Sequence, residues 1–167
     1  MILVMDVDYR QDKAVVAGIV LRDWQDETPI KEISTGCELV HDYVPGEFYR
    51  RELPCLLKLL EQVELELDTI VIDGYVYLGK ERTPGLGCYL YEALDKQVAV
   101  IGVAKNAFKN TPASTELRRG KSQRPLYITA AGIDEVDAKG CIQDMHGRDR
   151  IPTVLKRVDR LSREAGS

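Results

Sequence analysis

Three acidic residues occupy positions at which a carboxylate could do chemistry. Asp6 interrupts an apolar run, residues 2–9, that is typical of a strand. Asp73 ends a second apolar run and is followed by Gly74, which allows a ligand or backbone to approach closely. Glu52 falls in a segment with helical spacing. Because ligand sites in α/β sheets form where strands end, we expect these carboxylates to meet.

Carboxylate oxygens from two strands and a helix could bind Mg²⁺, or Mn²⁺ as a substitute. Such a site could activate water for an in-line displacement at phosphorus. Each acid also has a simpler interpretation. An Asp-Gly pair after a strand is usually a turn, Glu52 could be a solvated helix residue, and Asp6 could face an exposed edge.

Two further features suit a nucleic-acid substrate. Lys105 directly follows the apolar run 98–103 and could hold a phosphate or stabilise a leaving oxyanion, although a lone lysine is more often a surface residue. Tyr43, Pro45 and Gly46 belong to a stiff turn whose aromatic ring could wedge between stacked bases. The alternative is a helix-entry turn with the tyrosine packed on the core.

The elements that must position these residues follow the order βββ-α-β-α-β and then a tail. Three opening strands with short connections favour an antiparallel meander, and the later alternation of strands and helices favours parallel strands covered by helices. We therefore predict a single α/β domain over residues 1–167, with the mixed sheet of the ribonuclease-H-like fold. The predicted strands are 2–9, 13–21, 30–40, 69–72, 98–103 and 126–129, the predicted helices are 46–62, 86–96 and 150–164, and 106–124 is predicted to be a loop or arm.

Composition excludes several classes of protein. The 167 residues contain no apolar run long enough to span a membrane. The four cysteines are scattered without metal spacing, so we expect no zinc site or disulfide scaffold, and a reduced, cytoplasmic setting. The net charge of -4 argues against a nucleic-acid partner, but residues 1–104 carry -9 and residues 105–167 carry +5. The basic part contains Arg118, Arg119, Lys121 and Arg124, which we expect to face a phosphate backbone.

Several segments in one order resemble the endonuclease V family, which nicks nucleic acid near deaminated bases, above all inosine. The resemblance covers about residues 2–130. Its anchors are residues 5–9 (MDVDY), 43–52 (YVPGEFYRRE), 72–74 (IDG), 84–87 (PGLG), 101–105 (IGVAK), 119–120 (RG) and 124–128 (RPLYI).

The resemblance implies a role for each matching position. Asp6, Glu52 and Asp73 match the metal-binding carboxylates, and Lys105 matches a lysine near the scissile phosphate. The turn from Tyr43 through Pro45 to Gly46 matches a strand-separating wedge. The pocket for a flipped base matches Gly74, Gly85 and Leu86. The implied reaction is Mg²⁺-dependent cleavage of a phosphodiester in DNA or RNA, leaving a 3′-hydroxyl and a 5′-phosphate, with a role in DNA repair.

The chain also departs from the family pattern. Residues 75–83 contain no histidine, and Gly132 is followed by residues 133–137 without one, so that Asp134 or Asp137 could replace a histidine ligand. Three rival hypotheses therefore stand beside an active nuclease. They are a weak or inactive nucleic-acid-binding homologue, a nucleotide phosphohydrolase on the same fold, and an interaction protein with no site.

Overall fold

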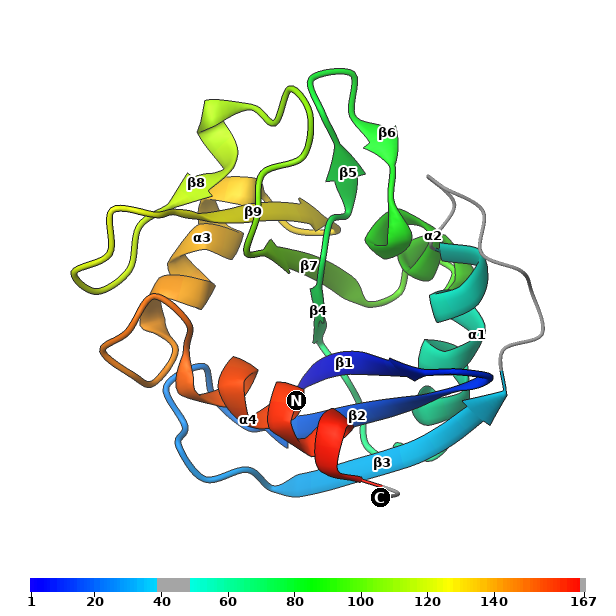
Figure 1. The fold of residues 1–167 in the computed structure, drawn as a ribbon. Helices are drawn as coiled ribbons and strands as arrows, with labels where there is room; N and C mark the ends of the chain where they lie inside the picture. The colour runs from blue at the N-terminus through cyan, green and yellow to red at the C-terminus, as the bar shows by residue number, and fades with distance from the viewer. Residues whose placement is uncertain (39–48, 166–167) are drawn as a thin grey trace.

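The computed structural model describes residues 1–38 and 49–165. Seven strands of this part of the chain form one mixed sheet in the order β3-β2-β1-β4-β7-β9-β8 (Figure 1). The strands are β1 (Ile2–Arg10), β2 (Lys13–Leu21), β3 (Lys31–Glu38), β4 (Thr69–Asp73), β7 (Ala99–Ala104), β8 (Glu116–Leu117) and β9 (Leu126–Ala131). β1, β4 and β7 are parallel, and the other neighbours in the sheet are antiparallel. The predicted meander and mixed sheet are confirmed.

Helices cover both faces of the sheet, which explains why its central strands are apolar without alternation. On one face, α3 (Glu135–Asp144) and α4 (Thr153–Glu164) bury a core with Val4, Val71 and Val103. On the other face, α1 (Tyr49–Leu60) and α2 (Leu86–Ala93) bury a second core, which includes Leu3 and Met5. Side chains of even and odd number in β1 therefore point to different helices.

The structure corrects several predicted elements. The tail contains α3, which the sequence analysis did not predict, and α4 begins only at Thr153, directly after Pro152. Residues 106–124 are not all loop, because a short 3-10 helix, η1 (Ala113–Thr115), leads into β8. A two-stranded ribbon, β5 (Tyr77–Leu78) with β6 (Thr83–Pro84), was also missed. Such short strands carry too little periodicity to be recognised in a sequence.

Pro54 lies inside α1 and does not end the helix. The four cysteines are free, with Cys37, Cys55 and Cys88 buried. Among the described residues, no helix has the length and apolar character needed to cross a membrane.

Candidate active site

The register of the parallel strands brings Asp6, Asp73 and Lys105 together. Met5 of β1 pairs with Ile72 of β4, so the next residues along the two strands, Asp6 and Asp73, are neighbours. Asp73 in turn pairs with Val103 of β7, two residues before Lys105. Because partners in a ladder point to the same face, all three polar side chains lie on the face that α3 and α4 cover. The strand register therefore places Asp6, Asp73 and Lys105 close together at one region of the sheet.

Asp6 is a buried carboxylate, with only 9% of the residue exposed. The backbone N–H of Val7 donates a hydrogen bond to its Oδ1 at 2.9 Å. Burial, the charge of Asp73 and the neighbouring Asp159 carboxyl together raise the pKa of Asp6 to about 7, whereas the hydrogen bond from Val7 lowers it. The location of Asp6 among apolar strand neighbours is therefore not that of an exposed edge.

Asp73 and Lys105 form the second pair of charges in the site. Protein atoms around the strand ends remove water from the Asp73 carboxyl and raise its pKa, as does the charge of Asp159, whereas the Lys105 ammonium lowers it. The lysine thus offsets part of the repulsion within an otherwise acidic cluster. It is half-buried at the end of β7.

Glu52 approaches from the opposite face of the sheet, in the first turn of α1. Burial raises its pKa to about 7, and a hydrogen bond from the Tyr9 hydroxyl partly opposes this rise. Tyr9 is on β1, and the Arg51 guanidinium lies 5.2 Å from the centre of its ring. The same contact with Glu52, together with burial, raises the pKa of Tyr9. Tyr9 is therefore a neighbour of the site that the sequence analysis did not single out.

Asp159 of α4 is a fourth carboxylate at the site, and the sequence analysis missed it. It lies on the helical stripe of Leu155, Val158 and Ser162, all three of which are buried. An acid on an apolar stripe was the signal that could have identified it. Asp134 is instead the N-cap residue of α3, and Asp137 lies in the first turn of that helix, where its charge acts on Cys141.

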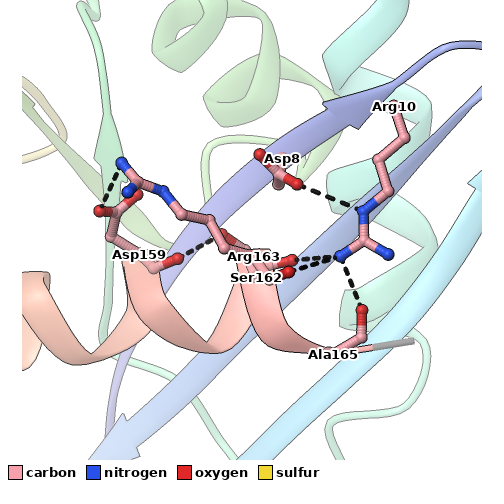
Figure 2. A network of polar contacts seen from close by, with 6 residues as sticks. All are labelled: Asp8, Arg10, Asp159, Ser162, Arg163 and Ala165. Atoms are coloured by element: carbon pink, nitrogen blue, oxygen red, sulfur yellow. Dashed lines mark hydrogen bonds and ion pairs between the residues drawn. The ribbon is translucent and has the colours of Figure 1, made fainter. Parts of the chain in front are cut away.

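The C-terminal turn of α4 is fixed by Arg10 at the end of β1 (Figure 2). Its Nη2 donates to the backbone carbonyls of Ser162, Arg163 and Ala165 at 3.2, 2.8 and 2.8 Å. Its Nε pairs with Asp8 at 3.3 Å. These carbonyls have no partner within the helix, so a cation is the expected cap for them.

The donor chemistry of the site suits a divalent cation. All four acids offer oxygen, the ligand that Mg²⁺ and Mn²⁺ prefer. A cation would relieve the repulsion between neighbouring carboxylates that, together with burial, raises the pKa values of Asp6, Glu52 and Asp73. In the part of the chain that the structure describes, no group of three or more Asp, Glu, His or Cys side chains already stands in a metal-holding arrangement. Binding would therefore require these side chains to turn toward the ion.

An apolar cavity of about 420 Å³ opens beside the carboxylates. Glu52 and Asp73 lie in its wall, and so do Gly74, Gly85 and Leu86, the three residues predicted to form a base pocket. A Cβ on Gly85 would lie 2.7 Å from the carbonyl oxygen of Tyr75, so only glycine allows this close approach. The remaining lining residues are Tyr49, Tyr75, Leu78, Thr83, Pro84 and Phe108.

Tyr75 and Phe108 are cavity residues that the sequence analysis missed. The Tyr75 hydroxyl donates to the carbonyl of Asn106 at 2.7 Å and accepts from the N–H of Phe108 at 3.1 Å. This anchors the segment after Lys105 against the cavity. Phe108 belongs to the segment predicted to be a polar loop, in which a single aromatic residue gives no periodic signal.

The predicted wedge and the basic residues near position 120 are the remaining expectations from the sequence. Tyr43, Pro45 and Gly46 lie outside the described residues. The expectation that Arg119 faces a phosphate backbone is wrong, since only 3% of the residue is exposed and its guanidinium donates to the carbonyls of Met145, Gly147 and Asp149. Its basic neighbours Arg118, Lys121 and Arg124 are all exposed.

Comparison with known proteins gives one consistent family. The model of the endonuclease V family matches residues 1–159. Endonuclease V of Pyrococcus horikoshii is 27% identical over 161 residues, which cover 95% of this chain and 71% of that protein. The crystal structure of endonuclease V from Bacillus subtilis is similar with a TM-score of 0.81 and 19% identity, over 97% of this chain and 78% of the other.

A second structure is that of Ciona intestinalis endonuclease V in complex with a 24mer DNA containing an inosine followed by a ribo-adenosine. It is similar with a TM-score of 0.78 and 20% identity, over 98% of this chain and 84% of the other. At these identities the two crystal structures establish the fold, and the family model establishes the membership.

Proposed function

Because the chain belongs to the endonuclease V family, we propose that it is a metal-dependent endonuclease that cleaves a phosphodiester near a deaminated base, inosine, in DNA or RNA. The observation that carries this proposal is the cavity that contains Glu52 and Asp73 in its wall. A base held there would present its neighbouring phosphodiester to Asp6, Asp73 and Lys105. The complex of the Ciona protein with inosine-containing DNA supports the same substrate class.

Asp6, Glu52 and Asp73 would hold Mg²⁺ or Mn²⁺, and Asp159 is close enough to Asp6 to contribute to the same site. When bound, the ion would supply a Lewis acid that lowers the pKa of water and stabilises charge at phosphorus. Lys105 would place its ammonium near a phosphate oxygen and stabilise negative charge as it develops there.

The apolar cavity would receive the base after it leaves the stack. A base inside a duplex cannot be reached by a pocket of this kind, so extrusion is required, at a cost of a few kcal/mol. The aromatic and aliphatic walls would contact the base, while Gly74 and Gly85 let the backbone come close to it. The biological role that follows is repair of deaminated nucleic acid, and we place it in the cytoplasm on the basis of the four free cysteines.

A nicking assay tests the proposal. Oligonucleotides with one inosine, as single- and double-stranded DNA and RNA, are incubated with Mg²⁺, Mn²⁺ or EDTA, and an oligonucleotide with guanine in place of inosine is the matched control. We expect metal-dependent cleavage of the inosine substrate, lost with EDTA and in Asp73→Ala and Asp6→Ala. Equal nicking by these variants and the wild type would contradict the assignment.

The same assay separates the rival functions. Binding of the inosine oligonucleotide without cleavage would identify a nucleic-acid-binding homologue, and hydrolysis of free nucleotides but not of polymers would identify a phosphohydrolase. Metal binding has its own measurement, since an ion that binds only the folded state raises the melting temperature. Mn²⁺ should raise the melting temperature of the wild type but not that of the double variant Asp6→Asn, Asp73→Asn.

A further inference from the structure

A basic groove of about 540 Å³ runs along α4. Five cationic side chains line it, against two acids. Its lining residues are Lys105, Arg150, Ile151, Lys156, Asp159, Arg160, Arg163 and Glu164. The excess of positive charge stands out in a chain whose net charge is -4.

The groove is continuous with the carboxylate site. A small cavity of about 10 Å³ contains Asp6, Asp73 and Lys105 in its wall. It shares Asp73 with the apolar cavity on one side, and it shares Lys105 and Ile151 with the basic groove on the other. Apolar cavity, carboxylates and basic groove therefore follow one another along a single path across the surface.

Both walls of the groove are held in place by guanidinium groups that bind backbone carbonyls. Arg150 donates to Arg124 at 3.1 Å, to Pro125 at 2.9 Å and to Lys105. At the other wall, Arg10 fixes the last turn of α4 (Figure 2). The groove thus has a defined shape rather than being a set of unrelated surface cations.

The cations of α4 differ in how far they are already neutralised. Lys156 pairs with Asp149 at 2.5 Å, and Arg157 pairs with Glu32. Arg163 pairs with Asp159 at 3.0 Å, as Figure 2 shows. Arg160 is exposed and makes no ion pair with any residue in the described ranges 1–38 and 49–165. Among the groove cations of α4, Arg160 is therefore the one that no acidic side chain of the described residues neutralises.

We propose that this groove binds the sugar-phosphate backbone of the substrate strand, on the far side of the cleaved bond from the flipped base. The inference rests on the proposed function, and it adds where the strand continues after the carboxylates. The chemistry is sequence-independent, because Arg160 would contact phosphate rather than base edges. The flank held in the groove would fix the scissile bond between two anchored ends.

Salt dependence and strand length test the proposal. Each phosphate neutralised on a single strand contributes about -0.7 to the slope of log K against log salt. In fluorescence anisotropy with EDTA, using single-stranded DNA with one central inosine, Arg160→Gln should weaken binding about three- to tenfold and make the slope shallower by about 0.7. Under cleavage conditions the loss should appear in KM rather than in kcat.

The matched control is Arg157→Gln, which removes the same charge from the same helix outside the groove lining. It should leave the slope unchanged. Oligonucleotides shortened on one side of the inosine complete the test. Shortening the flank beyond the cleaved bond should abolish the difference between wild type and Arg160→Gln, whereas shortening the other flank should preserve it.

Equal slopes for the two variants, or a difference that survives both truncations, would overturn the groove proposal while wild-type cleavage of inosine substrates keeps the proposed function intact. A wild type that neither binds nor cleaves inosine oligonucleotides would overturn both. If Arg157→Gln changed the slope of log K against log salt as much as Arg160→Gln does, the effect would be one of overall charge and not of binding in the basic groove.

Discussion

The carboxyl group of Asp159 on α4 acts directly on that of Asp6 on β1 and helps to raise the pKa of Asp6, although 153 positions separate the two residues in the sequence. Each is an acid on an otherwise apolar surface, one in a strand and one on a helix stripe. Their interaction, with Asp73 beside them, concentrates negative charge at one place on the face of the sheet that α4 covers. The following predictions test what this concentration does and which other residues support the site.

Replacing Asp6 should stabilise the metal-free protein at neutral pH. Because the pKa of Asp6 rises from 3.8 to about 7 on folding, the folded state binds the proton more tightly than the unfolded state. This tighter binding of the proton stabilises the folded state fully below about pH 4, and the stabilisation is lost as the pH rises through about 7. Asp6→Asn should thus gain about 2 to 4 kcal/mol over wild type at pH 8, and much less at pH 4.

Urea unfolding in EDTA at the two pH values measures this difference. The Val7 N–H can still donate to the side-chain oxygen of the introduced asparagine, so the substitution keeps that contact. If Asp6→Asn were less stable than the wild type at pH 8, the ionised Asp6 carboxylate would not destabilise the folded protein, and the prediction would be wrong.

Tyr9→Phe should move the acid limb of the pH–rate profile to higher pH. The Tyr9 hydroxyl stabilises ionised Glu52, and its loss leaves burial to raise the pKa of Glu52 further above about 7. With Glu52 required as a carboxylate, the half-maximal rate should shift by roughly 0.5 to 1 pH unit. The rate at pH 9 should change little. An unshifted profile with a uniformly lower rate would mean that Tyr9 acts only on packing.

Gly85→Ala should damage the cavity more than the fold. The added methyl group would meet the Tyr75 carbonyl at 2.7 Å, so the cavity wall must shift, at a cost of about 1 to 3 kcal/mol. We expect a KM for the inosine substrate raised at least tenfold. Gly140→Ala on α3 is the control, since its Cβ meets nothing within 4 Å. It should leave cleavage unchanged and stabilise the helix by about 0.5 to 1 kcal/mol.

Arg119→Met should destabilise the chain by about 3 kcal/mol, because it removes the donor from one buried and two partly buried backbone carbonyls of residues 145–149. Lys121→Met, two residues further on and exposed, should stay within about 0.5 kcal/mol of wild type. Thermal unfolding of both variants decides between a structural Arg119 and a nucleic-acid contact. A stable Arg119→Met with weakened binding would favour the contact.

The central sheet and its acids were predictable because their signals are local and strong. Apolar strands that both end at acidic or basic residues, such as β4 at Asp73 and β7 before Lys105, fix the register of the site once the strands are parallel. The helix stripe that holds Asp159 was visible as well, but its position over β1 depends on contacts between the two ends of the chain. No local pattern encodes those contacts.

The role of Arg119 could not be read from the sequence for a related reason. In a segment rich in turn residues and basic residues, an arginine that binds backbone carbonyls looks the same as one in solvent. Only tertiary structure decides which of Arg119 and Arg124 is buried. The cavity residue Phe108 is a similar case, since Tyr75 anchors its segment from a different part of the fold.

The hydrogen bonds from Arg10 to the last turn of α4 have a consequence for the order in which the site folds. It joins residues 152 to 155 positions apart, so its contacts form only after the intervening chain has collapsed. Asp159 and the wall of the basic groove are positioned by that same event. A partly folded chain without docked α4 would have Asp6 and Asp73 on the sheet and Glu52 on α1, but would lack Asp159 and the basic groove. The onset of activity during refolding should therefore lag behind formation of the sheet and coincide with the docking of α4.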